Sequence, residues 1–167
     1  MHASYSKGWW DDSTACVNAS GAKNPMYDDV TTVNREIHAV GTDYLKYRNT
    51  GVSVCGDLSS AHSRVRVQLE RQALRPNEAN LDAIAQVTSD AAILAGTFRG
   101  EQDSRALLLV NTQNPWNPAA SADVRLQPQA EFVILHQGER KEAFLVPADG
   151  LTLHLESGEW AFVELVR

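Results

Sequence analysis

The chain ends on Trp160-Ala161-Phe162-Val163-Glu164-Leu165-Val166-Arg167, a run that is apolar at nearly every position. A short run that is apolar on both sides is typical of a strand covered on both faces. The preceding stretch 151–155 instead alternates leucine with Thr152 and His154, and strict alternation predicts a half-buried strand. These two stretches predict that the C-terminal part of the chain is built from β-strands.

Further strand-like segments run back from this end and are separated by turn residues such as those of Asp149-Gly150. They lie at 52–54, 64–70, 84–88, 92–98, 105–111, 122–126, 131–136 and 142–146. Many short strands at hairpin spacing favour an antiparallel β-sandwich over a fold of alternating strands and helices. The predicted fold class is therefore mainly β, an antiparallel sandwich preceded by one long amphipathic α-helix.

The predicted helix runs over about 25–46. Asn24 is a good N-cap and Pro25 suits the first helical position, while Gly51 is a stop signal. The apolar residues at helical spacing are Tyr27, Val30, Val33, Ile37, Val40 and Tyr44. We expect two parts, with the aromatic segment and helix in 1–50 and the β-sandwich in 51–167.

Composition narrows the classes of partner. The chain has 167 residues and a net charge of −6, which argues against nucleic acid or an anionic membrane as partner. The apolar runs are far shorter than the ~20 residues that a membrane helix needs. With no signal-peptide pattern at the start, a cytoplasmic location is the default expectation.

Cysteine and histidine spacing indicates neither a metal nor a cofactor. Cys16 and Cys55 are the two cysteines, and we expect free thiols, with a single bridge as the alternative. The histidines show no ligand-type spacing, so a metal site would need ligands from distant strands. Nucleotide-binding glycine loops and nucleophile elbows are also missing from the sequence.

Paired carboxylates are needed for glycoside hydrolysis, and the sequence offers no convincing pair. Asp11 and Asp12 are adjacent, as are Asp28 and Asp29, and adjacent side chains point in different directions on either a strand or a helix. Catalytic residues are therefore not expected in this chain.

Aromatic residues are the candidates for carbohydrate contact. Trp9 and Trp10 next to Asp11 combine flat apolar faces with a hydrogen-bond acceptor, although the segment could equally cover the helix or the sheet. Trp116 lies between turns and either stacks on a sugar or packs its loop onto the sandwich. Trp160 is expected in the core.

The order of these features resembles one part of a known enzyme family. Residues 8–41 (GWWDDSTACVNASGAKNPMYDDVTTVNREIHAVG) resemble the passage that closes the (β/α)8 barrel of clan-A, β-galactosidase-like glycoside hydrolases, with Asn18 where Asp is usual. The stretches ILAGTF (93–98), ALLLVN (106–111) and L-x-L-x-L-x-x-G-E-W-A-F-V-E-L (151–165) resemble the accessory β-sandwich that follows such barrels.

The resemblance implies a noncatalytic role. In that family the two catalytic carboxylates lie upstream in the barrel, and a barrel needs about 250 residues. The expected function is an accessory sandwich domain that packs against a catalytic barrel. The alternative is a free-standing carbohydrate-binding or protein-interaction module.

The helix also predicts an interface. Its stripe of Tyr27, Val30, Val33, Ile37 and Tyr44 would normally be shared with a barrel, so without one it should lack cover. Large exposed apolar patches usually find a partner, and a twofold dimer is the commonest solution. We therefore expect self-association through the first 50 residues, with a monomer whose helix folds back onto the sandwich as the alternative.

Overall fold

The computed structural model describes residues 15–18, 20–71, 81, 85–114, 116 and 120–166. Its two helices are α1 (Pro25–Tyr44) and α2 (Ser63–Arg71), within the residues described. The strands are β1 (Arg48–Cys55), β2 (Ala85–Thr88), β3 (Ile93–Arg99), β4 (Arg105–Asn111), β5 (Ser121–Pro128), β6 (Phe132–Gln137), β7 (Arg140–Leu145), β8 (Leu151–Glu156) and β9 (Trp160–Val166). Short 3₁₀ turns lie at η2 (Leu58–Ser60) and η3 (Glu101–Asp103).

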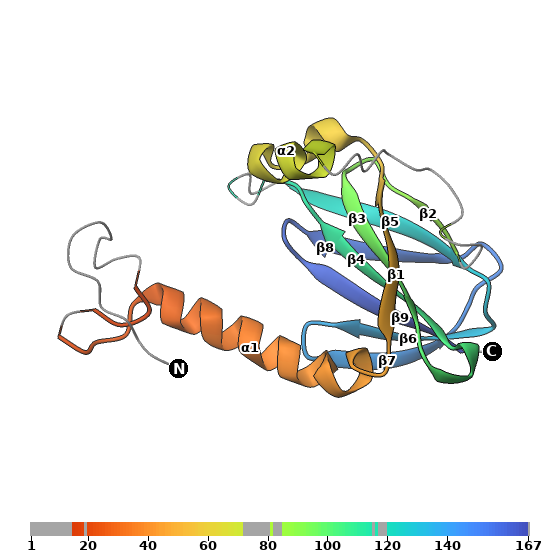
Figure 1. Ribbon diagram of the computed structural model, residues 1–167, viewed down its shortest axis with the longest axis horizontal. Helices are drawn as coiled ribbons and strands as arrows, with labels where there is room; N and C mark the ends of the chain where they lie inside the picture. Colours follow the sequence, from red (N-terminus) through yellow and green to blue (C-terminus); the bar gives the residue numbers. More distant parts are fainter. Residues whose placement is uncertain are drawn as a thin grey trace.

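The strands form two antiparallel sheets. One has six strands in the order β1-β3-β4-β9-β6-β7, and the other has three in the order β2-β5-β8. The prediction of an antiparallel β-sandwich preceded by one long helix is confirmed (Figure 1).

Strand β9 lies inside the six-stranded sheet and is covered on both faces, as its apolar run predicts. Ala161 and Val163 belong to the core between the two sheets, together with residues of β5 and β8. Phe162 points to the opposite face, where it clusters with Phe98 and with aromatic residues at the end of α1. The sheet is therefore packed from one side by the smaller sheet and from the other by the C-terminal end of the helix.

Helix α1 begins where the sequence predicts, but two details differ. Asn24 is the N-cap, yet its side-chain amide donates to the carbonyl of Ala15 and makes no capping bond. The helix ends at Tyr44, and Gly51 lies inside β1 next to an irregularity in the register with β3, so the prediction of Gly51 as the helix stop is wrong. Figure 1 shows α1 running outward from the sheets, with its C-terminal end against them.

The predicted strand at 64–70 is wrong, because the whole stretch lies in helix α2. Val65 and Leu69 are four residues apart, a spacing that places them on one face of either a strand or a helix. The residue that separates the two possibilities is Val67, which is 42% exposed and points away from the packed face. Leu69 packs with Val54 and Ala92 at the edge of the large sheet.

Candidate functional site

The outer face of α1 carries large apolar side chains that nothing in the described part of the chain covers fully. Met26 and Val30 are each 38% exposed, Val33 is 52% exposed and Ile37 is 56% exposed. Their spacing of four, three and four residues places all four on one side of the helix. We call these four residues the α1 stripe.

The α1 stripe continues into an apolar groove between the helix and the large sheet. The groove has a volume of about 320 Å³, and nearly all of its lining is apolar. Its lining residues are Ile37, Val40, Gly41 and Tyr44 from α1, Leu108 and Val110 from β4, Trp160 and Phe162 from β9, and Gly158. Ile37 belongs to both features, so the stripe and the groove form one continuous apolar surface.

Aromatic edge-to-face contacts attach the C-terminal end of α1 to the sheet. The Tyr44 ring lies 5.3 Å from that of Phe98 and 5.6 Å from that of Phe162. Tyr47, in the connection to β1, lies 5.6 Å from Phe162. Such pairs contribute about 0.5–1.5 kcal/mol each beyond the burial of area.

Beside these rings lies a polar cluster of Asp43, Tyr47, His136 and Glu164. One Glu164 oxygen accepts from the Tyr47 hydroxyl at 2.9 Å, and the other lies 2.8 Å from His136 Nε2. Because an ionised carboxylate only accepts, His136 Nε2 carries the proton in this pair. His136 and Glu164 are buried, and Asp43 is nearly so.

Two lysines complete the polar cluster on the Asp43 side. The ammonium groups of Lys46 and Lys141 each lie 2.5 Å from a different oxygen of Asp43. Lys141 and Lys46 together hold the pKa of Asp43 at about 2, against an ordinary value of 3.8. Because Lys141 belongs to β7 and Asp43 to α1, this ion pair joins the helix to the edge of the large sheet.

The polar cluster contains atoms of the kinds that bind metal ions, but these atoms already have hydrogen-bond or ion-pair partners within the protein. Among the described residues, atoms of Asp43, His136 and Glu164 lie within 4.8 Å of one another, a set that could in principle hold a metal ion. Two ammonium groups, however, occupy both oxygens of Asp43, and His136 Nε2 donates to Glu164. A metal cation would have to displace the two ammonium groups and a buried hydrogen bond. We therefore interpret the cluster as a structural feature that attaches α1 to the large sheet.

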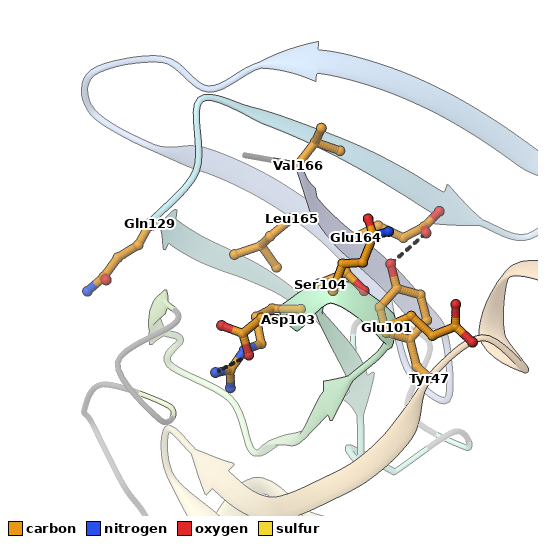
Figure 2. A pocket seen from close by; sticks show the side chains of 10 residues that line it. Tyr47, Glu101, Asp103, Ser104, Gln129, Glu164, Leu165 and Val166 are labelled. Carbon is orange, nitrogen blue, oxygen red and sulfur yellow. Dashed lines mark hydrogen bonds and ion pairs between the residues drawn. The ribbon is translucent and has the colours of Figure 1, made fainter.

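A second pocket, lined by both polar and apolar side chains, lies near the Tyr47 end of the polar cluster. Figure 2 shows it between Tyr47, η3, the β5–β6 turn and the last residues of β9. We call it the end pocket, and its volume is about 280 Å³. Burial, and then the hydrogen bond to Glu164, raises the pKa of Tyr47 to about 12, so its hydroxyl is a donor there at neutral pH.

The structure describes only some of the aromatic and acidic residues that the sequence analysis singled out. Trp9, Trp10 and Asp11 lie outside the described residues. Trp116 is 83% exposed, and its backbone N–H bonds to the Asn114 side chain. Trp160 is half-buried, lines the apolar groove and donates to Glu36 through its indole N–H at 3.1 Å.

The predicted interface residues all lie on α1 but differ in cover. Val30, Val33 and Ile37 are exposed, whereas Tyr44 packs against the sheet. Tyr27 is half-buried, and the Lys23 ammonium lies 4.1 Å from the centre of its ring.

Sequence reasoning missed the polar cluster. More than ninety residues separate Asp43 from His136, so no local spacing pattern connects these members of the cluster. One signal was available, because Glu164 is a carboxylate in the middle of an otherwise apolar strand. A charge at such a position needs a buried partner.

No family model, curated protein or solved structure matches this chain. In the part of the chain that the structure describes, no helix is long and apolar enough to cross a membrane.

Proposed function

We propose that this chain is a noncatalytic accessory domain that packs, through the α1 stripe and the apolar groove, against the catalytic barrel of a sugar-processing enzyme. The observation that supports this most is the row of exposed apolar side chains on one side of α1. A helix in a soluble protein normally buries its apolar face, because exposed apolar area costs free energy in water.

The energetics favour a partner with a broad apolar face. Full burial of a valine, isoleucine or methionine side chain contributes about 1.5–3 kcal/mol, so covering four half-exposed ones contributes roughly 1 kcal/mol each. The groove beneath Ile37 would add the faces of Leu108 and Trp160 to the same interface. Together they form a surface on which another body can dock without rearrangement of the sheets.

The fold also holds α1 in a defined direction. The aromatic contacts of Tyr44 and the Asp43–Lys141 ion pair fix the C-terminal end of the helix to the sheet. The N-terminal half, which carries Met26 and Val30, is thereby presented outward (Figure 1). A rigidly presented helix loses little conformational freedom when it binds.

The proposed occupant follows from the resemblance of residues 8–41 to the last loop and helix of a glycosidase barrel. In that arrangement α1 is a helix shared between barrel and sandwich, and its stripe faces the barrel. The polar cluster has no catalytic part in this proposal, because its carboxylates are engaged with lysines, a histidine and a tyrosine.

The test is site-specific crosslinking in cells that make the full chain. A photo-crosslinking amino acid replaces Val33 in one variant and Thr42 in the control variant. These positions are nine residues apart, so they lie on opposite sides of an α-helix with 3.6 residues per turn, and both are exposed.

We expect the Val33 probe, and not the Thr42 probe, to capture a polypeptide whose sequence contains a glycosidase barrel with its two catalytic carboxylates. The purified pair should then form a complex that Val33→Asp with Ile37→Asp weakens at least tenfold. Crosslinks at Val33 to a second copy of the chain alone, or to no protein, would contradict docking on a barrel.

A second candidate function is a free-standing carbohydrate-binding module, and the exposure of Trp116 favours it. A tryptophan that is 83% exposed offers a free ring face on which a pyranose can stack. Titration of oligosaccharides with tryptophan fluorescence as the readout tests this function. Binding that Trp116→Ala removes would support it, and equal binding by wild type and variant would contradict a role for Trp116.

A further inference from the structure

We propose that the end pocket binds a neutral polyhydroxylated molecule about the size of a single sugar ring. The pocket is formed by four segments that are far apart in the sequence, represented by Tyr47, Ser104, Gln129 and Glu164 (Figure 2). It lies apart from the α1 stripe, and this proposal does not depend on docking to a barrel.

The lining of the end pocket mixes hydrogen-bond donors and acceptors. Glu101 supplies a carboxylate, Gln129 an amide, Ser104 a hydroxyl and Arg105 a guanidinium group. A ligand that suits such a mixture must both donate and accept at neighbouring positions, as vicinal hydroxyl groups do. An apolar ligand would leave these groups without partners at a cost in free energy.

The charges around the end pocket argue against an anionic ligand. Of the described residues that line it, Glu101, Asp103 and Glu164 are acidic and Arg105 is basic. Arg99 and Arg105 both bond to Asp103, at 2.5 Å and 3.0 Å, so these two guanidinium groups and the three carboxylates together carry one net negative charge. A phosphate or a carboxylate that enters the pocket would therefore meet a net negative charge from the described residues around it.

The backbone is strained at the rim of the end pocket. Gln102 and Asp103 have φ angles of 52° and 61°, a left-handed conformation that costs non-glycine residues roughly 1–2 kcal/mol each. The two arginines on Asp103 hold this loop in place, and Nε of Arg105 is buried without a hydrogen-bond partner. Strain of this kind persists where surrounding contacts over-determine the backbone, and it concentrates at ligand sites.

Size limits the ligand to a small molecule. A volume of about 280 Å³ is close to the lower end of the ~300–1,000 Å³ range of small-molecule sites. One ring with its hydroxyl groups fits this volume, and a longer chain of sugars would extend into solvent. The Tyr47 ring adds an aromatic wall to the pocket.

The experiment is a titration of the isotope-labelled full chain with glucose, galactose and mannose, followed by backbone amide chemical shifts. Glucuronate serves as the anionic probe. The variants are Glu101→Ala and Gln129→Ala, which remove exposed groups from two different segments of the pocket. The matched control is Glu142→Ala, an exposed glutamate on β7.

We expect at least one neutral sugar to shift the amide signals of 101–105 and 164–166. Its dissociation constant should be millimolar, which corresponds to a free energy of binding on the order of −4 kcal/mol. Each pocket variant should weaken binding about tenfold, and glucuronate should bind at least tenfold less tightly than the best neutral sugar. The Glu142→Ala variant and the docking variant Val33→Asp/Ile37→Asp should bind as the wild type does.

Three results would overturn this assignment: no shift at these residues with any of the neutral sugars, tighter binding of glucuronate, or equal binding by the pocket variants and the control. Loss of barrel docking with sugar binding retained would refute the proposed function and leave the end pocket standing. Barrel docking without sugar binding would refute the end-pocket assignment and leave the proposed function standing.

Discussion

The carboxylate of Glu164 lies 2.8 Å from the Nε2 atom of His136, and both side chains are buried on the face of the large sheet that meets α1. The second oxygen of Glu164 accepts from Tyr47 in the connection between α1 and β1. Glu164 therefore connects two strands of the sheet to the end of the projecting helix.

Removal of this carboxylate should destabilise the fold. Glu164→Ala leaves the buried His136 and the half-buried Tyr47 without their acceptor, which we expect to lower the free energy of unfolding by on the order of 2–3 kcal/mol. Urea denaturation measures the change. Glu164→Gln keeps an acceptor oxygen and should lose less, and the exposed Glu142→Ala should stay within about 0.5 kcal/mol of wild type.

Acid should weaken the attachment of α1 through Asp43. Its pKa is lowered to about 2 in the folded chain, against 3.8 ordinarily, so the folded state binds the proton less readily. The stabilisation is complete above about pH 4 and is lost as the pH falls toward about 2. The melting temperature of Asp43→Asn should lie below that of wild type at neutral pH and converge with it near pH 2, whereas a constant gap would contradict this linkage.

The two cysteines should differ in reactivity. Cys55 is buried, and burial raises the pKa of its thiol to about 11, so little thiolate forms near neutral pH. Cys16 is half-exposed. An aromatic disulfide reagent should therefore modify one thiol of the native chain rapidly and the second only after urea is added. Simultaneous modification of both would show that Cys55 is reached in the folded state.

The strained rim of the end pocket should become more stable when glycine replaces Gln102. Glycine adopts a φ of 52° without a steric penalty, so Gln102→Gly should raise the free energy of unfolding by about 1 kcal/mol. The same change at the exposed β5 residue Gln127 should instead lower it by roughly 0.5–1 kcal/mol. Equal effects at the two positions would argue against stored strain at Gln102.

Local patterns predicted the strands well because side-chain alternation depends on residues that are close in sequence. The predicted strand 105–111 coincides with β4, and 151–155 falls one residue short of β8. The stretch at 64–70 failed because the spacing of Val65 and Leu69 fits a helix as well as a strand. Only the position of Val67, which depends on packing elsewhere, separates the two.

The sites were less predictable because they depend on contacts between distant segments. Asp43, His136 and Glu164 meet through the pairing of β6 with β9 and the return of α1 to the sheet. The end pocket likewise joins Tyr47 to Gln129 and to the strained loop at Gln102. Val30, Val33 and Ile37 of the α1 stripe were predicted from their helical spacing, which is local, whereas Met26 was not, and the exposure of all four could be established only in the fold.

The central claim is that the α1 stripe is a docking surface, and sedimentation of the isolated chain tests it most directly. Wild type should self-associate at chain concentrations on the order of tens of micromolar when no barrel covers the stripe. The control variant Thr42→Asp, on the opposite side of α1, should do the same. Val33→Asp with Ile37→Asp should sediment as a monomer over the same range. A wild-type chain that stays monomeric, or a double variant that associates as strongly as wild type, would contradict the account.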